Sequence, residues 1–256
     1  MTRLDPLILI TRPHAAATEF ASQLKSAQPD IKVAIHPLQE IEFVAKPHLI
    51  DAHFAAYVFT STNAVEAALK WQLPPRPCFV VGPKTAEAAQ AISNDIHNAQ
   101  GTADDLLQSL FAIDIKGPVL YVRGAHVSTD LKGRAEAHGI EIHEKIGYIQ
   151  QDIKPSADLL ADLARGGNPV ILPLFSARSA KLVLQAARPQ KHWHVIAMSR
   201  KVASLIDPKT VKNLNVAIRP DGPSMQSAVL QVWRECTKGE LLYGKYWKRR
   251  GDHGRR

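Results

Sequence analysis

The stretch Val58-Phe59-Thr60-Ser61-Thr62-Asn63-Ala64-Val65-Glu66-Ala67-Ala68-Leu69 decides the fold, because it predicts a buried strand that runs directly into a helix. Val58 and Phe59 are strand formers, and Asn63 with Glu66 three residues later predicts a helix start. A parallel strand that ends at a helix N-terminus directs backbone N–H groups into the crevice where α/β proteins bind ligands, and such a crevice favours anions. A single junction of this kind also fits a plain helix cap.

The same order of strand and helix is expected along the rest of the chain. Leu7-Ile8-Leu9-Ile10 is a continuous apolar run, which is typical of a strand buried on both faces of a parallel sheet. Thr102 with Asp105 predicts another helix start, and two further helices are expected to end near Ser93 and Gly139. The other expected strands are 31–35, 78–81, 119–122, 170–175, 194–198 and 215–218, with an extended stretch over 140–149 and irregular or extended chain over 37–47. This alternation predicts a doubly wound α/β fold with parallel sheets.

Length and composition predict two ordinary folded domains. The chain has 256 residues, 45% of them hydrophobic, and no low-complexity tract interrupts it. No apolar run approaches membrane-spanning length, so no membrane partner is expected. The N-terminus from Met1 to Pro6 has no signal-peptide pattern, and the protein is therefore expected to be cytoplasmic.

The net charge of +8 is concentrated in a basic tail, residues 238–256. This tail has seven Lys and Arg residues against two acidic ones, so it holds five of the eight net charges. With Tyr246 and Trp247 the tail could contact nucleic acid or anionic lipid, although a solvated terminus is the favoured interpretation. The remaining body is only mildly basic, which argues against a dedicated nucleic-acid-binding protein.

Cysteine and histidine usage points to no metal or thiol chemistry. Cys78 begins an apolar run and Cys236 lies late in a helix, so both are expected to be buried free thiols. Eleven histidines show no metal-ligand spacing, and the alternation in His192-Trp193-His194 fits the entrance of a strand. No glycine-rich dinucleotide loop follows an expected strand, and no Ser/His/Asp or Cys/His set can be assigned from spacing.

A weak internal repeat relates the two halves of the chain. Ser61 matches Ser176, and Arg12 matches Arg123, at offsets of 115 and 111 residues. A third match joins Gly82 to Ser199 at an offset of 117. General similarity among α/β units remains the alternative to a true repeat.

Seven short motifs, in this order, resemble the uroporphyrinogen-III synthase family. They extend from about Leu7 to Leu230, and the resemblance rests on their order and spacing because each motif alone is loose. The motifs are Ile10-Thr11-Arg12-Pro13, Phe59-Thr60-Ser61 with Asn63-Ala64-Val65, Val80-Val81-Gly82 with Thr85-Ala86, Ala103-Asp104-Asp105-Leu106-Leu107, Val122-Arg123-Gly124, Tyr148 ending an extended segment, and Phe175-Ser176 with Ser179.

The resemblance implies two doubly wound parallel-sheet domains joined by two extended crossing strands, with the first domain discontinuous. The outer domain would comprise residues 1–35 and 155–237, and the inner domain residues 42–147. The crossing segments would be residues 36–41 and 148–154, so that each half of the chain supplies elements to both domains.

The family's reaction closes hydroxymethylbilane, a linear tetrapyrrole with eight carboxylates, into uroporphyrinogen III with inversion of ring D and loss of water. The resemblance therefore implies a lyase of tetrapyrrole biosynthesis that uses no metal or organic cofactor. It implies a monomer whose partner is this small-molecule substrate, with transient contact to the enzyme that makes hydroxymethylbilane. A non-catalytic two-domain module that binds a small polycarboxylate or another anion is the alternative.

Helix N-termini and cations suit a substrate with many carboxylates, because both stabilise negative charge. The residues expected to line two facing walls of a cleft and to bind the substrate are Thr11, Arg12, Ser61, Thr62, Asn63, Lys84, Thr85, Arg123, Ser176, Ala177, Arg178, Ser199, Arg200 and Lys201. Family members often have Gly-Pro-Thr-Thr where this chain has Ser199-Arg200-Lys201-Val202, so contacts made by those threonine hydroxyls are in doubt here.

Tyr148 occupies the family's tyrosine position and is the candidate general acid. A phenol is protonated at neutral pH and could donate a proton to the departing hydroxyl of the substrate. A tyrosine that packs between the domains is the alternative.

Overall fold

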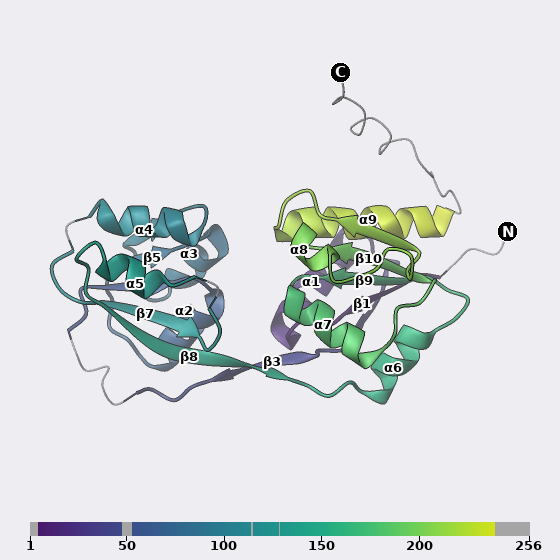
Figure 1. Cartoon of the computed structure of the whole chain (residues 1–256), viewed down its shortest axis with the longest axis horizontal. Coiled ribbons are helices and arrows are strands. Elements are labelled where there is room, and N and C mark those ends of the chain that lie inside the picture. Colours follow the sequence, from purple (N-terminus) through teal and green to yellow (C-terminus); the bar gives the residue numbers. More distant parts are fainter. Residues whose placement is uncertain (1–4, 48–52, 114, 128, 239–256) are drawn as a thin grey trace, which may run out of the picture. The chain divides into compact units, whose positions relative to one another are not determined.

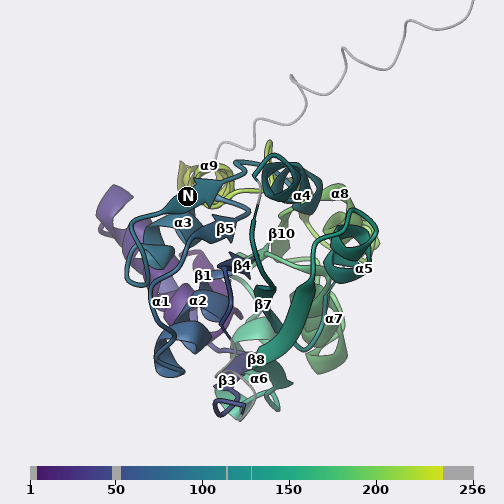
Figure 2. The same ribbon diagram turned by 90° about the vertical axis from the view of Figure 1, so that its left-hand side faces the viewer.

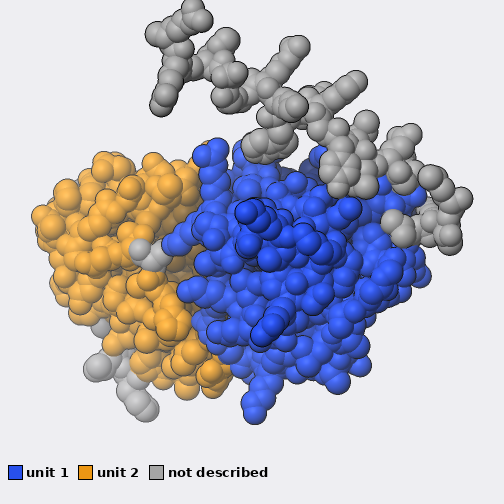
Figure 3. Space-filling model, turned by 45° about the vertical axis from the view of Figure 1, so that its right-hand side comes forward, with its two compact units in different colours: residues 1–40, 152–256 blue, residues 41–151 orange. Residues whose placement is uncertain are grey.

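The expected strands form two separate parallel sheets in the computed structural model, which describes residues 5–47, 53–113, 115–127 and 129–238. The basic tail from residue 239 onward lies outside the described residues. The chain divides into unit 1, Met1–Glu40 with Asp152–Arg256, and unit 2, Ile41–Gln151 (Figure 3). Both units alternate strands and helices, which confirms the α/β fold class with parallel sheets.

Unit 1 has one five-stranded sheet whose strands all run parallel, in the order β11-β10-β9-β1-β2. Its strands are β1 (Leu7–Ile10), β2 (Lys32–Ile35), β9 (Val170–Leu174), β10 (Trp193–Ala197) and β11 (Asn213–Val216). Every residue of β1, β9 and β10 is buried, because helices cover both faces. That double burial explains why these strands read as continuous apolar runs.

The two faces of the unit 1 sheet have separate hydrophobic cores. On one face α1 (His14–Ala27) and α9 (Gly222–Lys238) pack against Ile8, Ile10 and Ile171. On the other face α6 (Ala157–Ala164), α7 (Ala177–Ala186) and α8 (Arg200–Ala203) pack against Leu9 and Leu172.

Unit 2 has a six-stranded sheet in the order β3-β8-β7-β4-β5-β6. Its strands are β3 (Gln39–Phe43), β4 (Ala56–Phe59), β5 (Cys78–Val80), β6 (Ile96–Asn98), β7 (Val119–Gly124) and β8 (Ile142–Asp152). Helices α2 (Thr62–Lys70) and α3 (Pro83–Ala89) cover one face, and α4 (Ala103–Phe111) and α5 (Leu131–Glu136) cover the other (Figure 2). The strands from β7 to β6 are parallel.

Strands β3 and β8 carry the chain from one unit to the other, side by side (Figure 1). The Val44 N–H donates to the Gly147 carbonyl at 2.9 Å, and the Ile153 N–H donates to the Leu38 carbonyl at 2.9 Å. Residue numbers rise in one strand as they fall in the other, so the pair is antiparallel. The expected crossing segment 148–154 overlaps the end of the eleven-residue strand β8, and β3 lies within the segment 37–47 that was expected to be irregular or extended.

The sheet orders show how the internal repeat is distributed in space. The Arg12/Arg123 match aligns β1 with β7, and the Ser61/Ser176 match aligns β4 with β9. With these alignments the order β2-β1-β9-β10-β11 of unit 1 coincides with β8-β7-β4-β5-β6 of unit 2. Apart from the crossing strand β3, each unit therefore combines two strands from one repeat with three strands from the other.

Several boundaries differ from those expected from sequence. Helix α2 begins after Ser61, whose hydroxyl accepts the Asn63 N–H at 3.1 Å, so the expected start signal at Asn63 was wrong by two residues. Ser, Thr and Asn all cap helices well, and sequence alone does not select among three in a row. Helix α3 ends at Ala89, earlier than the expected Ser93. The expected helix stop at Gly139 is confirmed, because α5 ends at Glu136 and Gly139, with φ 79°, donates its N–H to the Glu136 carbonyl at 2.9 Å. The edge strand β6 was missed because Ile96-His97-Asn98 has little apolar character.

Other expectations are confirmed. Thr102 and Asp105 form a capping box at the start of α4, and both cysteines are free and buried. Within the described residues no helix is long and apolar enough to cross a membrane. Buried His194 lies in β10, with its Nδ1 atom 3.2 Å from the Asn213 Nδ2 atom and its Nε2 atom 3.7 Å from the Cys236 sulfur.

The buried histidine predicts an acid-sensitive core. Burial, with a smaller contribution from Lys212, lowers the pKa of His194 from 6.5 to about 4. Because the unfolded state binds the proton more readily, the free energy of unfolding is expected to fall as the pH drops from 6.5 toward 4, and this contribution is fully present above pH 6.5. His194→Gln, which does not titrate, should lose less stability over that interval. Urea unfolding at several pH values measures the difference, with exposed His138→Gln as control; equal losses in wild type and His194→Gln would contradict the prediction.

Candidate active site

The topology of each sheet marks one place where a ligand is favoured. In an open parallel sheet the crevice lies at the carboxyl ends of two neighbouring strands whose connections run in opposite directions. That switch point falls between β1 and β9 in unit 1 and between β4 and β7 in unit 2. Thr11-Arg12, Thr60-Ser61 and Phe175-Ser176 follow three of these strands, and Arg123 is the last residue but one of the fourth, β7.

In unit 1 a cation–π contact joins the residues that follow the two switch-point strands. The Arg12 guanidinium carbon lies 3.9 Å from the centroid of the Phe175 ring, and that ring also makes an edge-on contact with Phe20 at 4.9 Å between centroids. Burial lowers the pKa of Arg12, with an opposing contribution from Glu19. Thr11 is buried and its hydroxyl has no hydrogen-bond partner among the described residues, which leaves an unsatisfied polar group at this edge.

Helix α7 begins at this edge with a complete capping box. The Ser176 hydroxyl accepts the Ser179 N–H at 3.1 Å, and the Ser179 hydroxyl lies 3.1 Å from the Ser176 nitrogen. Arg178, in the first turn, donates to the Asp152 carboxylate through Nε at 3.0 Å and Nη2 at 2.7 Å. The neighbouring α8 is only four residues long, and Ser199 caps it by accepting the Val202 N–H at 3.4 Å.

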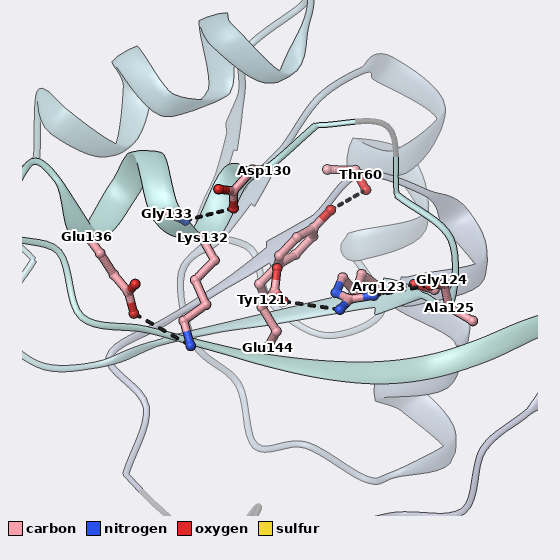
Figure 4. Close-up of polar contacts among 10 residues, drawn as sticks. All are labelled: Thr60, Tyr121, Arg123, Gly124, Ala125, Asp130, Lys132, Gly133, Glu136 and Glu144. Carbon is pink, nitrogen blue, oxygen red and sulfur yellow. Dashed lines mark hydrogen bonds and ion pairs between the residues drawn. The ribbon is translucent and has the colours of Figure 1, made fainter.

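In unit 2 a contact between two hydroxyl groups spans the switch point. The Thr60 hydroxyl lies 3.3 Å from the hydroxyl of Tyr121 on the neighbouring strand (Figure 4). Burial raises the pKa of Tyr121, and the hydrogen bond from Thr60 partly opposes this. Ser61 caps α2 with φ −157° and ψ 146°, close to the −150° and 160° of its repeat counterpart Ser176.

Arg123 has a different environment from Arg12, although the two occupy matching positions in the repeat. Its Nη2 atom lies 3.1 Å from a Glu144 carboxylate oxygen, and its Nη1 atom donates to the carbonyls of Gly124 at 3.0 Å and Ala125 at 3.4 Å (Figure 4). Its Nε atom is buried and has no hydrogen-bond partner in the part of the chain that the structure describes. The guanidinium therefore binds mainly to groups of its own unit.

Tyr148 lies in the middle of β8 rather than at the end of an extended segment. It is 9% exposed and belongs to the unit 2 core cluster that contains Phe59 and Val122. A Cβ atom added at Gly124 would lie 2.8 Å from the Tyr148 Cζ atom, so the glycine makes room for the phenol ring. The ring thus packs on the carboxyl end of β7, one of the two switch-point strands of unit 2.

All the residues expected from sequence to bind substrate lie at the carboxyl edge of their own sheet. Gly82 caps α3, whose first turn contains Lys84 and the buried Thr85. The unit 1 edge has Thr11, Arg12, Ser176, Ala177, Arg178, Ser199, Arg200 and Lys201, and the unit 2 edge has Ser61, Thr62, Asn63, Lys84, Thr85 and Arg123. Several of the hydroxyls cap helices, and two of the four arginines at strand ends or first turns bind carboxylates of their own unit.

Sequence reasoning missed five residues at these edges: Thr60, Tyr121, Glu144, Asp152 and Phe175. Thr60 and Phe175 directly precede the helix caps and match each other in the repeat, so that alignment could have identified them. The other three belong to strands, and nothing in their local sequence indicates which arginine or hydroxyl they meet.

Comparisons with known proteins agree on one family. The model of the family described as uroporphyrinogen-III synthase HemD matches residues 19–227. No curated protein matches the chain.

Two solved structures have the same fold. Uroporphyrinogen-III synthetase from Helicobacter pylori is 17% identical with a TM-score of 0.64, over 90% of this chain and 100% of that chain. A mutant uroporphyrinogen III synthase from Thermus thermophilus is 14% identical with a TM-score of 0.52, over 92% of this chain and 99% of that chain.

Proposed function

Because the chain belongs to the uroporphyrinogen-III synthase family, we propose that the carboxyl edges of its two sheets bind the carboxylates of the linear tetrapyrrole substrate. The chain is a lyase of tetrapyrrole synthesis that converts hydroxymethylbilane to uroporphyrinogen III. The residues that bind this substrate and promote its ring closure are the subject of the proposal.

The observation that carries the proposal is that the same polar junction occurs at the switch point of both units. In each unit a serine caps the helix that follows a switch-point strand, Ser61 before α2 and Ser176 before α7. The N-terminus of a helix offers unpaired N–H donors and about half a positive charge to an anion. A substrate with carboxylates along its whole length suits two such sites better than one.

The cations at these edges add to the attraction. Arg12 stays at the unit 1 edge because its guanidinium packs on Phe175, while Arg200 and Lys201 begin α8, which follows β10 at the same edge. Hydrogen bonds between a cation and a carboxylate are roughly twice as strong as neutral ones. We propose that these groups hold the substrate so that its two ends meet, since correct orientation alone can supply several kcal/mol, about 7–11 in favourable cases.

Tyr148 remains our candidate for the acid that assists departure of the substrate hydroxyl. Its position on the carboxyl end of β7, beside Gly124, supports this role because the reacting end of a substrate bound at the unit 2 edge would lie close by. The packing of its ring in the unit 2 core supports the alternative, a structural tyrosine.

The activity is tested with hydroxymethylbilane made enzymatically and added to the purified chain. Uroporphyrinogen III is expected as the main product, because the enzyme must invert ring D before closure. Chromatographic separation of the isomers measures the outcome, and heat-inactivated protein is the control for spontaneous closure. A product containing only isomer I would contradict the assignment and would favour a binding module.

The carboxylate sites are tested by filling each junction with a large side chain. Ser61→Trp and Ser176→Trp are each expected to raise KM about tenfold or more, since loss of one charge-assisted hydrogen bond costs about 1.5–3 kcal/mol. Steady-state kinetics provides the measurement. Thr102→Trp is the matched control, because Thr102 also caps a helix but follows the edge strand β6. Wild-type KM in both serine variants would refute these sites.

The role of Tyr148 is tested by removing only its hydroxyl. If the phenol donates the proton, Tyr148→Phe should lower kcat about 100-fold or more, the usual contribution of a general acid, with little change in KM. Thermal unfolding of the same variant reports on packing, which phenylalanine preserves. A kcat within twofold of wild type would leave only the structural role.

A further inference from the structure

Strand β8 carries two carboxylates, and each binds an arginine at the candidate edge of its own unit. Glu144, near the start of the strand, lies 3.1 Å from Arg123 in unit 2. Asp152, the last residue of the strand, lies 2.7 Å from Arg178 in unit 1. The strand that leaves one unit for the other is therefore attached to both candidate sites by ion pairs.

The two ion pairs differ in exposure. The side chains of Arg123 and Glu144 are 18% and 22% exposed, and Arg123 also binds two backbone carbonyls. The side chains of Arg178 and Asp152 are 29% and 53% exposed. An exposed pair contributes only about 0–1 kcal/mol, whereas breaking a buried pair leaves a charge uncompensated. The unit 1 pair is thus the one that another anion can displace.

Asp152 lies where a carboxylate of a ligand would be favoured. One of its oxygen atoms, Oδ1, accepts from both the Nε and Nη2 atoms of Arg178. Arg178 belongs to the first turn of the ten-residue helix α7, whose N-terminal end attracts negative charge. This first turn follows β9, one of the two switch-point strands of unit 1.

We propose that Asp152 competes with a substrate carboxylate for Arg178, so that substrate binding exchanges an internal carboxylate for an external one. This inference rests on the proposed carboxylate site in unit 1. Displacement of Asp152 breaks the contact between the end of β8 and α7. The backbone hydrogen bond between Ile153 and Leu38 then still holds the end of β8 to unit 1. Occupancy of Arg178 is in this way coupled to the strand that connects the units.

The competition has a definite kinetic signature. Breaking the Asp152–Arg178 ion pair makes the free energy of substrate binding less favourable but does not change the barrier of the chemical step. Asp152 therefore raises KM and leaves kcat unchanged. Asp152→Asn keeps the shape of the side chain but removes its charge, and it is expected to lower KM about two- to fivefold, which corresponds to an exposed ion pair. Asp152→Ala should give the same result.

A matched control separates this contact from a general change in charge. Asp5→Asn alters the net charge equally and breaks an exposed ion pair with Lys32, 2.6 Å away. This pair lies at the amino ends of β1 and β2, away from the carboxyl edge. The KM of Asp5→Asn should equal that of wild type. An equal decrease of KM in Asp5→Asn and Asp152→Asn would show a nonspecific electrostatic effect and would overturn the proposal.

A double-mutant cycle completes the test. Arg178→Ala should raise KM, and Asp152→Asn should then have no further effect in that background. An unchanged or raised KM in Asp152→Asn would overturn the competition, and a raised value would mean that Asp152 orients Arg178 for the substrate. Formation of isomer III by these variants is scored separately, so the proposal can fail while the proposed function stands.

Discussion

Burial of both faces of each parallel sheet is the constraint on which the rest of the structure depends. Helices cover the two faces of β1, β4, β9 and β10, so these strands are buried along their whole length. Polar side chains are few within them, with His194 of β10 as a buried exception, because burial of a polar group is costly. The carboxyl edge, where helix N-termini also lie, therefore combines polar groups with a potential that favours anions.

The internal repeat and the discontinuous unit are two aspects of one arrangement. Apart from β3, each unit takes two strands from one repeat and three from the other, which requires the chain to cross twice, through β3 and β8. Because these crossing strands are themselves paired, they serve as more than linkers. Strand β8 supplies the carboxylates that neutralise Arg123 and Arg178, so the connection and the candidate site share residues.

Repeated residues have diverged in their roles. Arg12 and Arg123 match in sequence, but one packs its guanidinium on the Phe175 ring and the other binds Glu144. The serine caps have been retained in nearly the same backbone conformation at Ser61 and Ser176. A cap depends on three or four consecutive residues, whereas the partner of a long cationic side chain comes from another strand. Local geometry is therefore repeated more faithfully than the electrostatic environment.

The sequence by itself determined the elements, the fold class and the set of polar junctions, because apolar periodicity, helix caps and strand-ending residues such as Ser61 and Ser176 act over a few neighbouring positions. The sequence did not reveal the edge strand β6, which has little apolar signal. It placed the start of α2 two residues late, because three consecutive residues can cap that helix equally well. Only the tertiary structure decided that Arg178 meets Asp152, that Tyr121 meets Thr60, and that Tyr148 packs beside Gly124. These partners are 26, 61 and 24 positions apart along the chain, and only the packing of strands and helices in the folded units brings them together.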